Sequence, residues 1–196
     1  MRVEVWFDYL CPWCYLATDR VRYLHDRHGI DVRWRPFELH PEIPPGGADL
    51  AGRPGSGSVV RRLADEAGLP INRRPRSNNT RTALAFSTWA DTDPGWEGLH
   101  LGLFHAYWAE GADLEDPDVL VGVAAEAGID PDRSRRALEG GAGMTAVHDS
   151  KTAAMDLGIG ATPGWHFGDG VVFTGVHPDA VMDRIVERAL ERSTRP

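Results

Sequence analysis

Two cysteines carry the chemistry that this sequence suggests. Cys11 and Cys14 are the only cysteines among 196 residues, and a random pair would lie three residues apart in roughly 1% of arrangements. Disulfide exchange needs one thiol that ionises near neutral pH and a second thiol close enough to resolve the mixed disulfide. Because a C-x-x-C pair provides both, we expect the two cysteines to cycle between dithiol and disulfide.

Pro12 and Trp13, between the two cysteines, fit the start of a helix. If Cys11 is the N-cap residue, Pro12 lies in the first turn, where its missing N–H is not needed. The unpaired amide groups and the positive end of the helix dipole then favour a thiolate on Cys11. Cys14, one turn further, is shielded and suits the resolving thiol, while Trp13 would lie beside the sulfurs as a contact for a partner.

Two alternatives to redox chemistry at this motif are half of a structural zinc site and a pair of inert thiols. Zinc would need two further ligands, and the eight histidines form no compact H-x₃₋₅-H array with the cysteines. We therefore expect no metal and no cofactor apart from the redox-active disulfide.

The segments around the pair predict a β-α-β opening. In residues 3–7 apolar side chains alternate at short period, and this segment directly precedes the cysteine motif, which indicates a strand. Apolar residues then recur among charges until Gly29, as in a helix. Residues 30–35 alternate strictly between apolar and charged and stop at Pro36, which indicates a strand with one buried face. The cysteines thus stand at the first strand-to-helix junction.

The middle of the chain predicts a loop followed only by helices. Residues 41–54 are rich in Pro, Gly, Ala and Asp, which favour turns. Between residues 58 and 157 every periodic stretch has helical spacing, and no strand signal interrupts it. The expected helices are Val59 to Ala67, Thr80 to Ala90, Trp96 to Ala109, Pro117 to Ala127, Pro131 to Leu138 and Met144 to Leu157.

The C-terminal part returns to β character. Residues 165–167 and 171–173 flank the turn-forming residues 168–170, Gly-Asp-Gly, which predicts a hairpin. From Pro178 onward one broad apolar face indicates a closing helix. The expected fold class is α/β. Residues 1–40 and 158–196 form one domain, and residues 41–157 form a loop plus an all-helical insertion.

Composition excludes several classes of protein. With 42% hydrophobic and 26% charged residues, the chain can bury a core without disulfides. A net charge of -8 argues against nucleic acid and against anionic membranes as partners. No apolar run approaches the length of a membrane span, and Arg2 and Glu4 interrupt any signal-peptide core. We therefore expect a cytoplasmic protein.

Several motifs resemble the DsbA-like thioredoxin proteins of the FrnE type. They are residues 11–14 (CPWC), 33–41 (RWRPFELHP), 79–80 (NT), 103–108 (LFHAYW) and 158–163 (GIGATP). The resemblance implies a thioredoxin domain interrupted by a helical insertion. It also implies a cis-proline at Pro163 facing the cysteines, beside which an extended substrate pairs with the backbone. The two cysteines would be catalytic, and Pro12, Trp13, Thr162 and Pro163 would bind substrate.

The residues around this proline depart from the family. Its members usually carry Val before the proline and an apolar residue after it, whereas Thr162 and Gly164 stand here. Thr162 resembles the arrangement in thioredoxins. Because a hydroxyl near a thiolate can shift the pKa in either direction, the direction of electron flow stays open.

The same fold and many flanking residues resemble the kappa-class glutathione transferases and 2-hydroxychromene-2-carboxylate isomerases. Those enzymes, as the resemblance implies, have a serine in place of Cys11 and activate glutathione with it. The two cysteines favour a thiol–disulfide oxidoreductase acting on thiol- or disulfide-containing proteins or small molecules, with glutathione open as reductant or co-substrate. A transferase or isomerase and a non-catalytic binding module are the alternatives. The oligomeric state stays open.

Two further groups of residues each have two interpretations. Asp8 lies three residues before Cys11. In the functional interpretation its carboxylate raises the thiol pKa or relays a proton; in the structural interpretation it caps a turn. The large aromatic residues of the helical stretch either line a substrate groove or pack into the core. These aromatic residues are Trp89, Trp96, Phe104, Tyr107 and Trp108.

Overall fold

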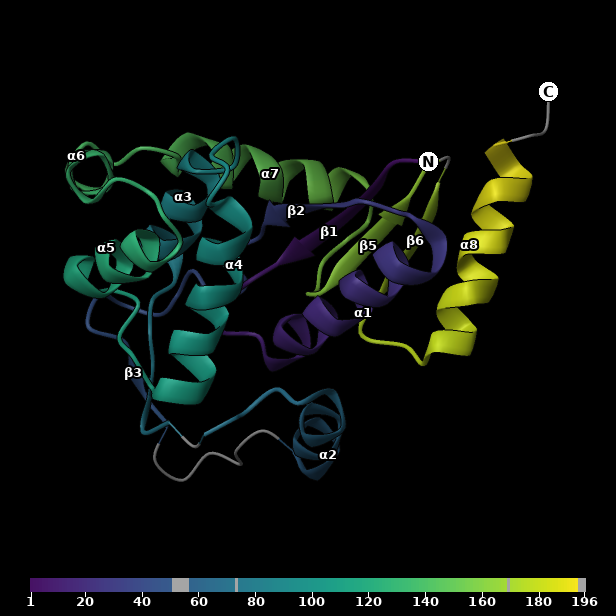
Figure 1. Cartoon of the computed structure of the whole chain (residues 1–196), viewed down its shortest axis with the longest axis horizontal. Coiled ribbons are helices and arrows are strands. Elements are labelled where there is room, and N and C mark those ends of the chain that lie inside the picture. The colour runs from purple at the N-terminus through teal and green to yellow at the C-terminus, as the bar shows by residue number, and fades with distance from the viewer. Residues whose placement is uncertain (51–56, 73, 169, 194–196) are drawn as a thin grey trace.

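A four-stranded mixed sheet organises the molecule (Figure 1). The computed structural model describes residues 1–50, 57–72, 74–168 and 170–193. In sheet order the strands are β2 (Val32–Pro36), β1 (Val3–Phe7), β5 (Gly164–Phe167) and β6 (Val171–Thr174). β1 is parallel to β2 and antiparallel to β5, and β5 is antiparallel to β6. The expected β-α-β opening and the C-terminal hairpin are therefore confirmed.

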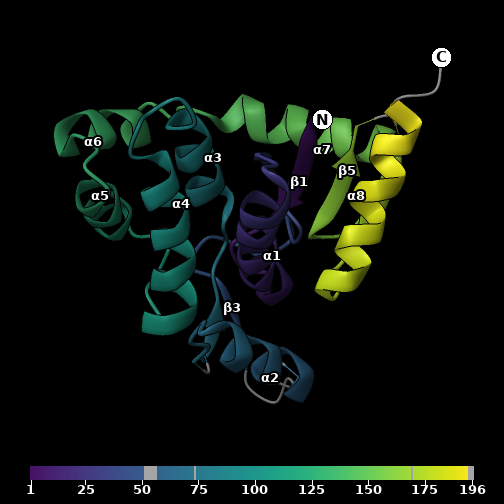
Figure 2. The same cartoon turned by 45° about the vertical axis from the view of Figure 1, so that its right-hand side comes forward.

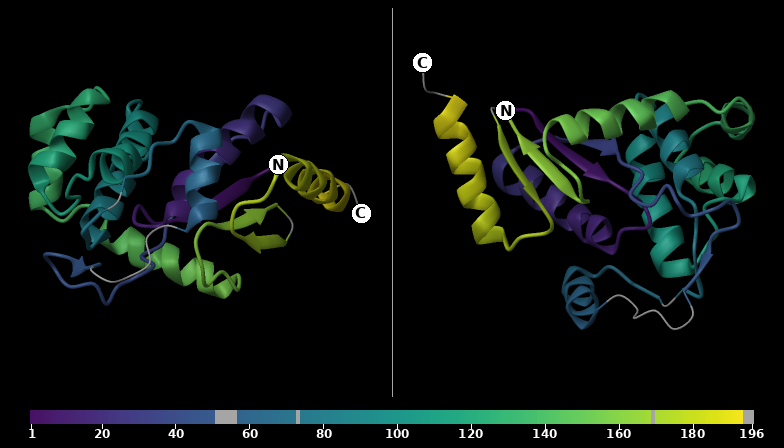
Figure 3. Two further views of the ribbon diagram at one scale, coloured as in Figure 1. Left: turned by 90° about the horizontal axis from the view of Figure 1, so that it is seen from below. Right: turned by 180° about the vertical axis from the view of Figure 1, so that it is seen from behind.

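Helices cover both faces of this sheet. Figure 3 shows α1 (Pro12–His28) on one side and α7 (Met144–Asp156) on the other, and α8 (Asp179–Ser193) packs against α1. The alternation along β1 explains the two layers, since successive side chains of a strand point to opposite faces. Val3 and Val5 pack with apolar residues of α1 and α8. Trp6 packs with α7, where its indole N–H donates to the carbonyl of Ser150 at 3.0 Å.

The remaining helices lie outside these layers (Figure 2). They are α2 (Ser58–Ala67), α3 (Arg81–Trp89), α4 (Trp96–His105), a π-helical turn (Ala106–Glu110), α5 (Pro117–Glu126) and α6 (Pro131–Glu139). In this view α2 packs on α1 and lies below it, and the others gather to one side of α1 and β1. Each expected helix is confirmed to within a few residues. The starts of α5 and α6 follow from the Asp-Pro pairs, because Asp116 and Asp130 accept backbone N–H groups of the first turn. The fold class is α/β, a thioredoxin-like fold with helices inserted.

A second, small sheet corrects the sequence prediction. β3 (Ala48–Asp49) and β4 (Arg76–Ser77) pair antiparallel, although no strand was expected between residues 58 and 157. The ladder is too short for periodicity to reveal. It depends on a distant contact, since the Arg76 guanidinium donates to the carbonyls of Gly46 and Gly47. Residues 51–54 of the expected loop and Asp169 of the expected turn lie outside the described residues.

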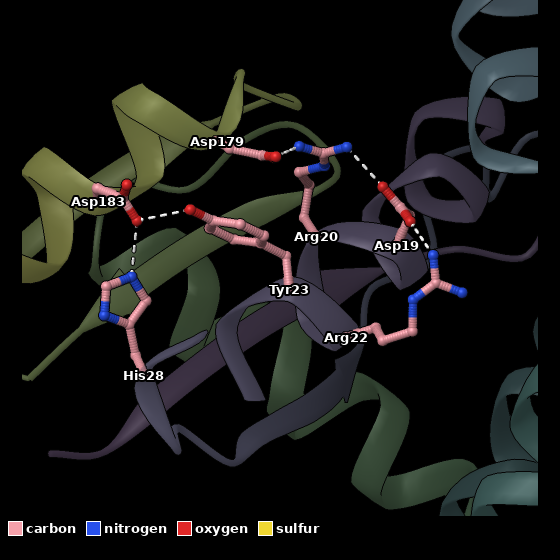
Figure 4. A network of polar contacts seen from close by, with 7 residues as sticks. All are labelled: Asp19, Arg20, Arg22, Tyr23, His28, Asp179 and Asp183. Atoms are coloured by element: carbon pink, nitrogen blue, oxygen red, sulfur yellow. Dashed lines mark hydrogen bonds and ion pairs between the residues drawn. The ribbon is translucent and has the colours of Figure 1, made fainter. Parts of the chain in front are cut away.

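Polar contacts hold α8 on α1 beside their shared apolar core (Figure 4). The Tyr23 hydroxyl donates to a carboxylate oxygen of Asp183 at 2.8 Å, and Nε2 of His28 lies 2.7 Å from the same oxygen. Arg20 bridges Asp19 of its own helix and Asp179 of α8. No helix in the described part of the chain combines the length and apolar character that a membrane span requires.

Candidate active site

The cysteine motif begins α1 as expected. Cys11 is the N-cap residue with an extended backbone (φ -86°, ψ 114°), and Pro12 is the first helical residue. The backbone N–H groups of Cys14 and Tyr15 donate to the Cys11 carbonyl at 3.0 and 3.3 Å. The first turn contains no acidic residue. The helix dipole therefore acts on Cys11 without an opposing carboxylate in that turn.

The two thiols differ in their electrostatics. Both are free and buried, with 4% of Cys11 and none of Cys14 exposed. A hydrogen bond from the Cys14 thiol lowers the pKa of Cys11, against the effect of burial. Burial raises the pKa of Cys14 well above its usual value, and the hydrogen bond to Cys11 raises it further. The arrangement therefore favours a thiolate on Cys11 and a protonated Cys14.

The segment before β5 lies against the sulfurs. The Thr162–Pro163 peptide bond is cis, and the Cys11 thiol donates to the Thr162 carbonyl at 3.4 Å. The proline isomer and its position facing the cysteines are thus confirmed. The Thr162 hydroxyl lowers the pKa of both thiols, although it has no hydrogen bond of good geometry within the described residues.

Gly164, the second departure from the family, has a steric cause. A β-carbon at this position would lie 2.2 Å from Cγ2 of Ile159 and 3.0 Å from the carbonyl oxygen of Ala161. Gly164 also pairs with Trp6 of β1. The close approach of the preceding loop to the central strand thus requires a residue without a side chain.

Asp8 is a wholly buried carboxyl beside the motif. Its Oδ1 accepts from the Thr80 hydroxyl at 2.5 Å and from the backbone N–H of Leu10 at 3.3 Å, and its Oδ2 accepts from the N–H of Leu39 at 2.8 Å. Burial raises the Asp8 pKa to about 6, although these three bonds lower it. Its charge raises the pKa of Cys11. Asp8 therefore has two of the expected roles: it accepts a backbone N–H in the turn before Cys11, and its charge disfavours the Cys11 thiolate. A role of Asp8 as a proton relay stays a prediction.

The aromatic residues of the helical stretch divide between the two expected roles. Phe104, Tyr107 and Trp108 are buried in one cluster with both cysteines, whereas Trp89 and Trp96 are half-buried. The Trp108 indole N–H donates to the carbonyl of Tyr9 at 2.9 Å and so supports the loop before Cys11. Core packing is thus the main role, while Trp96 lines a groove along α1.

Sequence reasoning placed the cysteines and the proline loop correctly but missed two supporting residues. Thr80 entered as part of a family motif and as the start of an expected helix, and its bond to Asp8 depends on the approach of α3. The bond between Trp108 and the loop joins residues 99 positions apart.

Pro12 and Trp13 lie half-buried at the start of α1. Among the described residues, no group of three or more His, Cys, Asp or Glu could hold a metal ion.

Comparison with known proteins agrees with this geometry. The family model described as DSBA-like thioredoxin domain matches residues 2–186. The crystal structure of a probable DsbA oxidoreductase, SCO1869 from Streptomyces coelicolor, is similar with a TM-score of 0.84 and 25% sequence identity. That similarity covers 100% of this chain and 92% of the other.

Two curated proteins are similar in sequence. The uncharacterized protein YwbO of Bacillus subtilis (strain 168) is 26% identical over 198 residues, which cover 97% of this chain and 96% of that protein. A 2-hydroxychromene-2-carboxylate isomerase of Sphingobium xenophagum is 23% identical over 182 residues, covering 88% of this chain and 91% of the isomerase. The similar proteins therefore include both an oxidoreductase and an isomerase.

Proposed function

Because the chain belongs to the DSBA-like thioredoxin domain family, we propose that it is a thiol–disulfide oxidoreductase acting on proteins or small thiols. One observation carries the proposal: two buried free thiols stand one helical turn apart at the start of α1, where the pKa of Cys11 is lowered and that of Cys14 is raised. This asymmetry provides a nucleophile and a protonated resolving group within one helical turn.

The exchange then follows in two steps. The Cys11 thiolate attacks one sulfur of a substrate disulfide, which forms a mixed disulfide and releases the other substrate sulfur as a thiolate. Cys14 gives its proton to that thiolate and attacks the Cys11 sulfur, which forms the Cys11–Cys14 disulfide and releases the second substrate thiolate. The substrate gains two electrons and the chain loses two. The reverse sequence oxidises a substrate dithiol.

Thr162 and Pro163 would guide the substrate to Cys11. In the dithiol form the Thr162 carbonyl accepts a hydrogen bond from the Cys11 thiol. When Cys11 is a thiolate or part of a disulfide, this carbonyl is free to accept a backbone N–H of an extended substrate. Pro163 has no N–H to obstruct the sulfur, and the half-buried Pro12 and Trp13 would form the rim.

A glutathione-dependent isomerase or transferase acting on a small organic molecule is the second candidate. It is favoured by the similarity to the Sphingobium isomerase, which extends over most of both chains. The proposal also gives the oxidoreductase a cytoplasmic location, as expected from the sequence. It assigns glutathione the role of reductant, which the sequence left open.

A redox titration tests the proposal. The purified chain is equilibrated in glutathione buffers of graded potential, and the cysteines are alkylated and counted while Trp fluorescence is recorded. We expect one reversible two-electron transition. A potential near about -120 mV indicates an oxidant, and one near about -270 mV indicates a reductase. Absence of a reversible disulfide would overturn the proposal, and turnover of 2-hydroxychromene-2-carboxylate with glutathione would then support the second candidate.

A further inference from the structure

A groove with a volume of about 810 Å³ runs between α1, β2 and α4. Figure 2 shows α1 and α4 beside each other at this place. Its walls extend along α1 from Tyr15, the residue after Cys14, to Asp26, which is 11 residues further and so roughly 16 Å along the helix. The volume is typical of a site for a small molecule. Nothing in the proposed disulfide exchange uses this groove.

The groove contains a buried polar atom without a partner. His100 lines it, is 1% exposed, and has no hydrogen-bond partner for Nε2 among the described residues. Nδ1 lies 3.1 Å from the Tyr9 hydroxyl, which accounts for the other ring nitrogen. An unsatisfied buried group costs free energy and is uncommon in folded proteins.

Aromatic rings surround this histidine. The Trp96 ring stacks on His100 with centroids 4.9 Å apart and an angle of 11° between planes, and Trp34 lies 4.6 Å away at 50°. Both tryptophans line the groove and are half-buried. Leu101, 42% exposed, adds apolar surface at the rim. These surfaces suit a flat, largely apolar molecule.

The charges around the groove favour a cation. Four carboxylates line it, against one guanidinium and three histidines: Asp19, Asp26, Asp31, Glu97, Arg22, His25, His100 and His105. Arg22 is already paired with Asp19, and burial lowers the pKa of His100 to about 3, so that this ring is uncharged near neutral pH. Asp26 and Glu97 form no ion pair within the described part of the chain. An excess of negative charge therefore lies above an aromatic floor, and both attract cations.

We propose that this groove binds a small planar aromatic molecule that carries a protonated amine. The ring lies against Trp34 and Trp96, and the amine points to Asp26 and Glu97. None of these contacts involves the cysteines, and the proposal does not depend on the proposed oxidoreductase activity.

Three indole compounds that differ in charge test the proposal on the full chain. Tryptamine, indole and indole-3-acetate carry a cation, no charge and an anion on the same ring system. Binding is measured by titration calorimetry and by saturation-transfer NMR. We expect saturable binding of tryptamine with an affinity at least about tenfold above that of indole-3-acetate, with indole between them. Absence of saturable tryptamine binding, or an equal or higher affinity for indole-3-acetate, would overturn the proposal.

Variants at the exposed rim locate the site without disturbing the core. Leu101→Arg places a bulky cation over the groove and is expected to weaken tryptamine binding at least about tenfold. The matched control is Met155→Arg, since Met155 is 57% exposed on α7 and does not line the groove; its affinity is expected to equal that of the unmodified chain. Cys11→Ser is expected to leave binding unchanged. Undiminished affinity in Leu101→Arg, or loss of binding in Cys11→Ser, would refute the assignment.

Discussion

The sheet with α1 and the helical stretch from α2 to α7 contribute differently to the cysteine site. The first supplies the reactive groups, since Cys11 and Cys14 begin α1 after β1 and Thr162 precedes β5. The second supplies groups that hold the loop before Cys11. Thr80 binds the Asp8 carboxyl, and Trp108 binds the Tyr9 carbonyl. Chemistry and its support thus come from different parts of the chain.

The two regions also share one apolar core at the site. Phe7 of β1 and Cys14 of α1 are buried in the same cluster as Leu84 of α3 and Phe104 of α4. By contrast, the core between α1, α8 and the sheet contains no residue of the helical stretch among the described residues. The difference teaches that the cysteines lie where the two regions meet, so that a change in either should reach the thiols.

The largest effect is expected from Cys11→Ser, which removes the nucleophile. Disulfide exchange should fall by at least about a thousandfold, because a serine hydroxyl is not ionised near neutral pH and forms no disulfide. The rate of reduction of a model disulfide measures this. Cys14→Ser is the matched control: it should retain attack by Cys11 and accumulate a mixed disulfide with glutathione. If Cys11→Ser accumulates that adduct instead, the two roles are reversed.

Phe104→Ala should show that the helical stretch stabilises the whole molecule. The Phe104 ring is buried with its centroid 4.8 Å from Tyr9 and 5.8 Å from Tyr15, so its removal leaves a cavity beside the motif. We expect the free energy of unfolding in urea to fall by about 3–5 kcal/mol. Leu101→Ala on the same helix, at an exposed position, should change it by less than about 0.5 kcal/mol. A biphasic transition in which only the helices are destabilised would contradict the shared core.

Asp8→Asn should show how much the buried, ionised Asp8 carboxylate lowers the free energy of unfolding. Burial raises the Asp8 pKa from 3.8 to about 6, so the folded state binds the proton more tightly than the unfolded state. Stability from this group is therefore present at low pH and is lost as the pH rises from about 4 through 6. The shift corresponds to about 3 kcal/mol.

Urea unfolding of both proteins between pH 4 and 8 measures this difference. The free energy of unfolding of the unmodified chain should fall relative to that of Asp8→Asn as the pH rises across this interval. The same substitution should lower the pKa of Cys11, because it removes a negative charge that raises it. Parallel pH profiles for the two proteins would show that Asp8 is ionised without cost.

Thr162→Val should have the smallest effect and act on the thiols alone. It removes the hydroxyl that lowers the pKa of Cys11 and Cys14 while keeping the shape of the side chain. The Cys11 pKa, followed by thiolate absorbance against pH, should rise, and alkylation near neutral pH should slow by about two- to tenfold. Thr174→Val, at an exposed position of β6, is the control and should leave both unchanged. An unchanged or lower Cys11 pKa in Thr162→Val would refute this role.

Local patterns were sufficient to predict most elements of the fold. The alternation of Val32 and Trp34 with charged neighbours predicts a strand with one buried face, and Asp116 and Asp130 before prolines predict two helix starts, because neighbouring residues determine both features. The pairing of Ala48 with Ser77 in the small sheet was not predicted, because it depends on residues that are far apart in the sequence. Its partners are 29 positions apart, and a two-residue ladder has no period of its own.

By itself the sequence determined which atoms can react and which helix end they occupy. The spacing of Cys11 and Cys14 and the proline between them require only one turn of helix, which is a local property. Only the tertiary structure decided how those thiols ionise. The burial of Cys14, the approach of Thr162 and the raised pKa of Asp8 depend on segments far apart in the chain. Electrostatic energies depend on distance in space and on exclusion of water, and a sequence contains neither until the chain folds.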